Sequence, residues 1–300
     1  MSATKLLEED MYANKDGLEP FLSCVDHTVS RETFDLFLDR ETDLLVTVPR
    51  PSESELPGYY ESEDYISHTD SKRSLMDRMY QMVKNYSIKR KLKLINSLSG
   101  GRGKLLDLGC GTGDLLSACE KDGWKINGVE PNERARELAL GKVVSEGSIL
   151  NDIKDISSDL NHSFNVISMW HVLEHVPNLS EYIGRLKELL TADGYLIIAV
   201  PNFKSYDANH YKEFWAAYDV PRHLWHFSEK SIRHIFSLHN FEVVDTLPLI
   251  FDAFYVSLLS EKYKNGKSNL LSAFKTGLRS NLKARSSKQY SSMIYVIKNT

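Results

Sequence analysis

The stretch LLDLGCGTG, residues 105–113, decides the fold of this chain, because it joins an apolar run to Gly109, Gly111 and Gly113. The apolar run predicts a buried strand, and DLLSACEKDG (114–123) after it predicts a helix with a glycine stop. Glycines at such a junction let the chain turn tightly and let a ligand approach the backbone. The free N–H groups at the helix start favour a carboxylate or a phosphate. An ordinary glycine-rich turn is the alternative.

The residues on either side of this stretch alternate between strand and helix patterns. Continuous apolar runs predict buried strands, and apolar residues at helical spacing predict helices. Buried strands that alternate with helices indicate a parallel sheet covered on both faces, so the predicted fold class is α/β with a doubly wound sheet. We expect strands at 104–109, 125–130, 164–170, 194–200, 241–247 and 291–298, and helices at 71–97, 114–123, 132–142 and 179–190.

A carboxylate stands at the end of the second of these strands. The segment KINGVE ends in Glu130, seventeen residues beyond Gly113. In a doubly wound sheet this residue lies at the tip of the neighbouring strand, where it accepts hydrogen bonds from both ribose hydroxyls of a nucleoside. A solvated glutamate is the alternative. A nicotinamide dehydrogenase is also conceivable from the glycines alone, but its fingerprint is Gly-x-Gly-x-x-Gly and this one is Gly-x-Gly-x-Gly.

Four segments together resemble the class I S-adenosylmethionine-dependent methyltransferases: LLDLGCGTG, GVEPN (128–132), FNVISMWHVLEHV (164–176) and GYLIIAVPN (194–202). The resemblance is strong over 104–202. It implies a Rossmann-like, mostly parallel sheet of seven strands whose last strand is antiparallel, within a domain spanning 71–300. It also implies S-adenosylmethionine as cofactor. The implied cofactor-binding residues are Asp107, Gly109, Gly111 and Gly113 at the methionine end, Glu130 at the ribose, Asp152 at the adenine, and Trp170 and His171 on the methyl-transfer side.

The stretch His171-x-x-Glu174-His175 carries groups that take protons or bind metals. If a helix begins after Trp170, the three side chains share one face. Imidazole takes a proton near neutral pH, so His171, His175 and His223 are the candidate catalytic bases. Two imidazoles and a carboxylate also suit a divalent metal, and some quinol O-methyltransferases with a similar stretch use one. We expect no metal here, because three ligands on one turn are geometrically demanding.

The segment after the strand at 194–200 is dense in His, Trp, Tyr and Arg, and we interpret about 203–227 as a substrate lid. It resembles a segment of bacterial quinol-methylase-like enzymes. Because it follows a strand, it should lie over the carboxyl ends of the sheet, where substrates bind. Its candidate acceptor-binding residues are His210, Trp215, Asp219, Arg222 and His223. A structural lid packed by its aromatic side chains is the alternative.

Residues 1–70 are acidic and interrupted by prolines, and we expect an extension or cap. Some relatives in the quinol-methylase-like group carry a zinc knuckle there. In this chain DRETDL (39–44) stands where cysteines are expected and only Cys24 is left, so the knuckle region is degenerate. The three cysteines fit no disulfide framework, and the N-terminal residues do not form a signal peptide, which favours a cytoplasmic protein.

The segment 268–285 is a basic amphipathic helix pattern. We expect its apolar stripe to pack on its own domain, with peripheral membrane contact as the alternative.

The predicted function is methyl transfer from S-adenosylmethionine to an O or C nucleophile of a small-molecule, glycan or lipid-linked acceptor. An RNA or protein methyltransferase and a non-catalytic cofactor-binding protein are the alternatives. No nucleic-acid partner is expected, because no basic face follows the whole domain and no Asn-Pro-Pro-Tyr-type loop follows the fourth strand.

Overall fold

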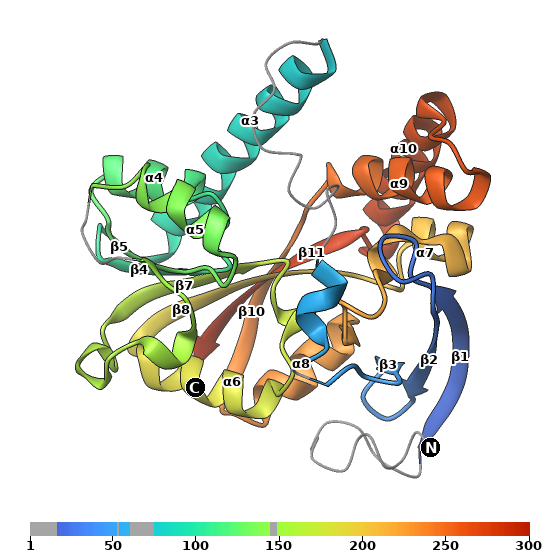
Figure 1. Cartoon of the computed structure of the whole chain (residues 1–300). Coiled ribbons are helices and arrows are strands. Elements are labelled where there is room, and N and C mark those ends of the chain that lie inside the picture. Colours follow the sequence, from blue (N-terminus) through green and yellow to red (C-terminus); the bar gives the residue numbers. More distant parts are fainter. Residues whose placement is uncertain (1–16, 53, 61–74, 145–148) are drawn as a thin grey trace.

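The computed structural model describes residues 17–52, 54–60, 75–144 and 149–300. Two sheets organise the chain: a central sheet of seven strands and a smaller antiparallel sheet at its side (Figure 1). The central sheet has the order β10-β11-β8-β7-β4-β5-β6. Its strands are β4 (Lys104–Leu108), β5 (Lys125–Val129), β6 (Ile149–Leu150), β7 (Phe164–Trp170), β8 (Leu190–Pro201), β10 (Phe241–Pro248) and β11 (Ser292–Asn299).

The strand directions confirm the predicted doubly wound α/β fold. The strands β4, β5, β6, β7 and β8 run parallel to one another, whereas β11 is antiparallel to both β8 and β10. All six strands predicted for this sheet are present. The carboxyl ends of β4, β5 and β7 therefore meet at one edge of the sheet, which is where ligands bind in folds of this kind.

Helices cover both faces of the central sheet, as the continuous apolar strands require. Leu105 and Leu106 of β4 point to opposite faces and belong to different clusters of buried side chains. One cluster includes α3 (Leu75–Leu98), α4 (Asp114–Lys121) and α5 (Glu133–Leu140), and the other includes α6 (Leu179–Leu189) and α8 (Glu229–Ser237). In Figure 1 the first three helices lie above the sheet, and α6 and α8 lie below it.

The smaller sheet joins the N-terminal region to the predicted lid. It has the order β1-β2-β3-β9, with β1 (Leu18–Val25), β2 (Thr33–Asp39), β3 (Leu44–Val48) and β9 (Trp225–His226). Of these four strands the sequence indicates only β3, through the short apolar run LLVTV (44–48). Between β2 and β3, the Asp39 carboxylate accepts hydrogen bonds from the backbone N–H of Glu41 (2.9 Å) and the hydroxyl of Thr42 (2.7 Å). The acidic segment 39–44 therefore makes a tight turn rather than a metal knuckle.

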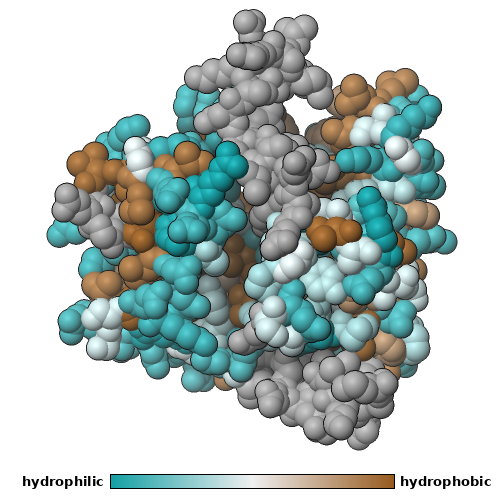
Figure 2. Space-filling model, viewed as in Figure 1, coloured by the Kyte–Doolittle hydropathy of each residue, from teal (hydrophilic) through white to brown (hydrophobic). Residues whose placement is uncertain are grey.

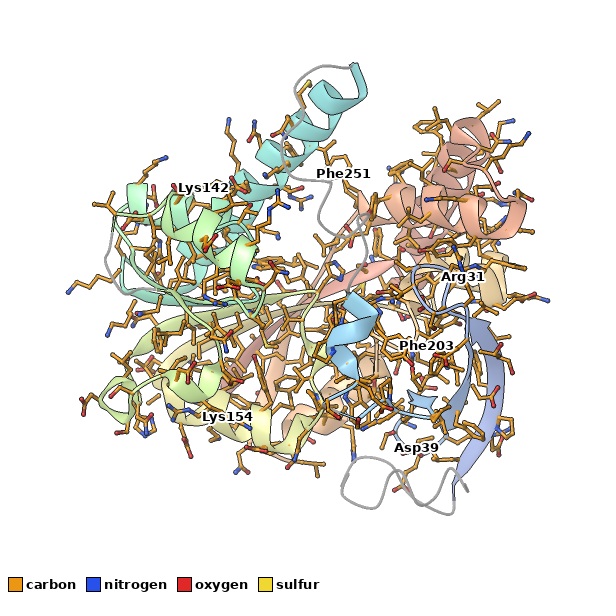
Figure 3. All side chains as sticks on the ribbon, in the orientation of Figure 1. Arg31, Asp39, Lys142, Lys154, Phe203 and Phe251 are labelled. Carbon is orange, nitrogen blue, oxygen red and sulfur yellow. The ribbon has the colours of Figure 1, made fainter. Side chains whose placement is uncertain are left out.

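The lid itself consists of short helical turns rather than an open loop. It contains α7 (Tyr206–Tyr211) and two 3-10 turns, Lys212–Phe214 and Ala216–Tyr218. Its aromatic residues pack with Phe34, Leu36 and Leu45 of the small sheet in a third buried cluster. Phe203, at the start of the lid, lies within this packed region (Figure 3) and contacts the ring of Phe21 edge-on at 5.9 Å.

Two helices, α9 (Asp252–Asn265) and α10 (Leu270–Ser287), form a hairpin between β10 and β11. The sequence identified α10 but predicted its orientation wrongly. Its large apolar residues point to solvent, whereas Ala273, Thr276, Gly277, Ser280 and Ala284 are buried. The small residues face α9 because the two helices pack closely together. A Cβ on Gly277 would lie 2.8 Å from the Phe254 ring of α9. Within the described residues, no helix has the length and apolar character needed to cross a membrane.

Candidate active site

The glycine turn after β4 has a backbone that only glycine adopts readily. Gly109, Gly111 and Gly113 have φ angles of 65°, 55° and 75°. A Cβ on Gly109 would lie 2.4 Å from Val172 Cγ2, and one on Gly113 would lie 2.8 Å from Ala139 Cα. A Cβ on Gly111 would meet no atom within 4 Å. The turn is thus packed on both flanks and open at Gly111.

Glu130 lies beside this opening, as its position after β5 predicts. Its Oε2 atom accepts a hydrogen bond of 2.8 Å from the Gly111 N–H, and its Oε1 atom accepts one of 2.9 Å from the Asn132 N–H. The residue is only 9% exposed. Each carboxylate oxygen has a second lone pair, so the group retains acceptor capacity for a ligand.

Asp107 and Lys91 form a pair of opposite charges beneath the turn, in which Asp107 is buried and Lys91 is half-buried. The Ser168 hydroxyl donates a 2.6 Å hydrogen bond to Asp107. Burial raises the pKa of the Asp107 carboxyl to about 6, against the opposing effects of Ser168 and Lys91. Burial lowers the pKa of the Lys91 ammonium, and Asp107 and Asp252 oppose that shift. The Lys91 ammonium lies 4.1 Å from the centre of the Trp170 ring.

Sequence analysis missed Lys91 as a site residue, although a signal was present. Lys91 follows Ile88 by three positions and precedes Ile95 by four, so it lies on the apolar face of the predicted helix. A lysine there is costly to bury unless it meets an opposite charge or a ligand. Asp252 was also missed, and no sequence motif marks it.

His171 lies between two carboxylates at the end of β7. Its Nε2 atom is 2.9 Å from Asp252 Oδ2, and its Nδ1 atom is 3.2 Å from Glu174 Oε1. Burial disfavours the imidazolium, but these two carboxylates outweigh it and raise the pKa of His171 to about 10. His171 is therefore protonated at neutral pH. Its expected role as a base does not fit this geometry, because it already carries the proton.

The residues after Trp170 form no α-helix. The expectation that His171, Glu174 and His175 share one helical face is therefore wrong. His171 has a φ of 59°, and residues Leu173–His175 form a single 3-10 turn. The turn instead brings Glu174 and His175 to His223 of the lid, with one donor atom of each residue within 4.8 Å of the others. These three residues form the His–Glu cluster. The objection that one helical turn is too crowded for three ligands does not apply to it, because His223 comes from a different segment.

Backbone carbonyls orient both imidazoles of the His–Glu cluster. His175 Nδ1 lies 3.1 Å from the Arg222 carbonyl and 3.0 Å from the Tyr60 hydroxyl, and His223 Nδ1 lies 2.9 Å from the Ala217 carbonyl. His223 Nε2 lies 3.9 Å from Asp219 Oδ2, beyond hydrogen-bond distance, so the Nε2 atoms of both rings can still take other partners. Burial, followed by the nearby His223, lowers the pKa of His175 to about 4, so its ring is neutral at pH 7. Among the described residues, the buried Oε2 atom of Glu174 has no hydrogen-bond partner.

Arg222 and Asp219, two of the predicted acceptor-binding residues, are bonded inside the fold. The Arg222 guanidinium donates to Asp219 at 2.7 and 3.1 Å, to Asp26 at 2.9 Å and to the Tyr59 carbonyl at 3.0 Å. Its side chain is 2% exposed. These bonds tie the lid to the turn after β1, and they use the donors that an acceptor would need. The prediction that Arg222 and Asp219 orient the acceptor does not fit this geometry.

The other predicted lid residues are divided between the interior and the surface. The indole of Trp215 is buried and donates to Asp207 at 2.8 Å, which is a packing role. His210 is exposed at the end of α7 and stacks on Tyr206. His223 brings its imidazole to the residues that follow β7, where Arg222 contributes its backbone carbonyl. Asp152 is exposed and caps a 3-10 turn just after β6, beside the end of β5.

A family model for a methyltransferase domain matches residues 77–246, which include the glycine turn, Glu130 and the His–Glu cluster. The chain belongs to the methyltransferase-domain family. A ubiquinone biosynthesis O-methyltransferase of Rhodopseudomonas palustris (strain BisA53) is 30% identical over 117 residues, which are 38% of this chain and 45% of that protein. Another, from Shewanella halifaxensis (strain HAW-EB4), is 26% identical over 118 residues, or 37% of this chain and 50% of that protein. The chain thus spans about half the length of these curated relatives.

Solved structures share the methyltransferase fold at low sequence identity. Magnesium protoporphyrin IX methyltransferase from Synechocystis PCC 6803 has a TM-score of 0.54 and 16% identity, covering 83% of this chain and 100% of that one. The 1,6-didemethyltoxoflavin-N1-methyltransferase of Burkholderia thailandensis has a TM-score of 0.52 and 14% identity, covering 94% of this chain and 99% of that one. Both comparisons support the fold alone.

Proposed function

We propose that this family member transfers a methyl group from S-adenosylmethionine to an O or C nucleophile of a small-molecule acceptor. The observation that carries the proposal is the Glu130 carboxylate, which holds the Gly111 N–H at 2.8 Å where the ends of β4 and β5 meet. The carboxylate suits the ribose hydroxyls of a nucleoside. The open glycine turn beside it lets another part of the same ligand contact the backbone. Membership of the methyltransferase family supports a sulfonium nucleoside over a dinucleotide.

The methionine end of the cofactor is zwitterionic, and the pair beneath the turn matches it. Asp107 suits the amino group and Lys91 suits the carboxylate, since each places an opposite charge in a site shielded from water. Trp170, the last residue of β7, and His171 after it are proposed to line the methyl-transfer side. Asp152 is proposed to lie beside the adenine, and its position just after β6, the strand next to β5, supports this role.

The sulfonium methyl is already activated, so the protein must align the acceptor and take its proton. As the acceptor oxygen or carbon bonds to the methyl carbon, the carbon–sulfur bond breaks and its electron pair stays on sulfur. The acceptor's proton passes to an imidazole. His175 and His223 are the candidates, because the carbonyl contacts of their Nδ1 atoms leave Nε2 to accept. His171, already protonated, holds α9 to the turn after β7 through Asp252.

The acceptor class follows from the relatives. The curated relatives are named ubiquinone biosynthesis O-methyltransferases, which favours a hydroxylated ring, free or lipid-linked. A glycan acceptor would also offer a hydroxyl group, but the names of these relatives give it less support. An RNA or protein acceptor and a non-catalytic role are not favoured, since the names of these relatives point to small molecules and to catalysis.

The function is tested by calorimetry followed by an acceptor search. S-adenosylmethionine and S-adenosylhomocysteine are expected to bind, and nicotinamide dinucleotides are not. Cell extracts are then incubated with the full chain and methyl-labelled cofactor, and mass spectrometry identifies small molecules that gain one methyl group. Binding of a dinucleotide in preference to the sulfonium would contradict the cofactor proposal. Cofactor binding without any methylated product would favour the non-catalytic alternative.

Gly111→Asn is expected to weaken S-adenosylmethionine binding at least about tenfold. Asparagine tolerates positive φ, so the turn is kept, but its side chain occupies the space that the cofactor needs. Gly100→Asn is a matched control, because Gly100 also has a positive φ (62°) and a Cβ there would meet no atom within 4 Å, but it lies in the loop before β4. Calorimetry that shows equal losses in both variants would remove the glycine turn from the cofactor site.

Methyl transfer is expected to persist after dialysis against EDTA, because the sulfonium needs no Lewis acid. The His–Glu cluster nevertheless offers the donor set of a divalent ion: two imidazoles and an unpartnered carboxylate oxygen. Turnover is measured before and after chelation, with manganese or zinc added back. Loss of turnover that either ion restores would overturn the metal-free proposal and make these three residues ligands.

The N-terminal sheet is proposed to hold no zinc. Cys24 is the one cysteine among residues 1–60, whereas a structural zinc site draws on four cysteine or histidine ligands. Cys24, Cys110 and Cys119 are all buried free thiols. Free thiols support the proposal of a reducing, cytoplasmic location.

A further inference from the structure

The hairpin helix α10 presents its largest apolar side chains to solvent. Five of them are between 43% and 65% exposed: Leu270, Leu271, Phe274, Leu278 and Leu282. The buried side of the helix consists of small residues, and Gly277 allows it to pack closely against α9. This distribution is the reverse of an ordinary surface helix, which buries its large apolar residues and exposes polar ones.

The exposed apolar residues form one continuous stripe. At about 100° per residue, positions 270, 271, 274, 278 and 282 fall within roughly one third of the helix circumference. The brown surface at the upper right of Figure 2 lies over this part of the molecule, where Figure 1 places α10. Contiguous exposed apolar side chains of this kind mark an interaction surface.

Basic side chains surround the stripe. Lys275, Arg279, Lys283 and Arg285 lie on α10 and are exposed, and Lys264 and Lys267 precede it. From Lys262 to Thr300 the chain contains no Asp or Glu. Lys275 borders the stripe, and Arg279 and Lys283 lie farther round the helix, where their guanidinium and ammonium groups approach the Tyr206 ring at 5.3 and 4.4 Å. An apolar stripe bordered by cations is the pattern of a helix that lies in a membrane interface.

We propose that α10 docks this chain on the surface of a bilayer that contains anionic lipids. The exposed leucines enter the boundary between headgroups and acyl chains, and the lysines and arginines meet lipid phosphates. A second copy of the chain fits less well, because two such surfaces would bring like charges together. A nucleic acid would use the cations but would leave the leucines without an apolar partner.

The docking surface adjoins the proposed acceptor side of the active site. The hairpin begins at Asp252, which contacts His171, and the preceding Phe251 packs edge-on against Tyr86 of α3 at 5.5 Å. Figure 3 shows Phe251 between α3 and the C-terminal helices. On α10, the Ser280 hydroxyl donates a 2.6 Å hydrogen bond to Asp207 in the lid. A chain docked through α10 would hold the lid and the end of β7 near the membrane, where a lipid-linked acceptor resides.

Sedimentation with vesicles tests the proposal without requiring enzymatic activity. The full chain is expected to bind vesicles of equal parts phosphatidylglycerol and phosphatidylcholine, to bind pure phosphatidylcholine weakly, and to dissociate as salt increases. The variant Leu271→Gln/Leu278→Gln/Leu282→Gln is expected to bind at least about tenfold more weakly. Leu138→Gln/Leu238→Gln/Val244→Gln is the matched control, since its residues are 45%, 46% and 49% exposed on other elements, and it should bind like the wild type.

Circular dichroism and cofactor calorimetry accompany each variant, so that loss of folding is separated from loss of docking. The proposal is overturned if the wild-type chain ignores anionic vesicles, or if both triple variants bind them equally. It is also overturned if ultracentrifugation shows a dimer that the α10 variant dissociates and vesicles do not bind, because a second copy then covers the stripe. Since binding is measured without cofactor, these results do not depend on the proposed methyl transfer.

Discussion

Arg222→Ala is expected to lower the free energy of unfolding by about 3–5 kcal/mol, because it leaves buried carboxylates without their cation. The guanidinium bonds Asp26, Asp219 and the Tyr59 carbonyl, and its side chain is 2% exposed. Urea unfolding of the full chain measures the loss. The exposed pair of Arg40 with Glu19, on the same small sheet, provides the control, and Arg40→Ala should change stability by no more than about 1 kcal/mol.

The pH dependence of stability gives a second measurement of the same contact. Burial raises the pKa of Asp26, but the Arg222 guanidinium and the backbone N–H groups of Ser30 and Thr28 outweigh it and lower that pKa to about 2. Since the folded pKa lies below the ordinary value of 3.8, this stabilisation is present above pH 4 and is lost as pH falls toward 2. The Arg222→Ala variant should lose less stability over that range. If Arg222→Ala is as stable as the wild type and loses only turnover, the structural role is wrong and Arg222 binds the acceptor.

The cofactor half of the site could be predicted from sequence because short-range patterns specify it. The glycines at 109, 111 and 113 and Glu130 each follow an apolar strand, and parallel strands place their carboxyl ends together. The acceptor half depends on contacts between distant segments. His223 meets Glu174 and His175 only because β9 pairs with β3, a register that no local motif in the lid reveals.

The N-terminal sheet and the orientation of α10 were missed for a related reason. Residues 33–36 alternate exposed and buried side chains, but Asp35 and Asp39 make the strand look like part of a polar extension. On α10, periodicity locates an apolar stripe but does not show which side of the helix packs on the domain. The side that packs contains Gly277, because the absence of a side chain there allows close contact with α9. Small residues opposite a large apolar stripe are the signal that would have indicated an exposed stripe.

His223→Gln is expected to reduce methyl transfer about a hundredfold while S-adenosylmethionine affinity stays nearly unchanged, because general acid–base catalysis contributes at least that much. His223 belongs to the His–Glu cluster, and its Nδ1 atom is held at 2.9 Å from the Ala217 carbonyl, so Nε2 is left to accept a proton. Glutamine keeps a hydrogen-bonding group of similar size but cannot take the proton. Single-turnover transfer, cofactor calorimetry and thermal stability are measured on the same preparations.

His210→Gln separates the base role from a general contribution of the lid. His210 belongs to the same segment but is exposed and stacks on Tyr206 at a ring distance of 5.9 Å, away from the end of β7. Its replacement should leave transfer, affinity and stability unchanged. If His210→Gln loses turnover and His223→Gln does not, the acceptor binds the outer face of the lid and the His–Glu cluster is structural. If His223→Gln instead loses stability and cofactor affinity together, its contact with the Ala217 carbonyl holds the lid in place and His175 is the base that is left.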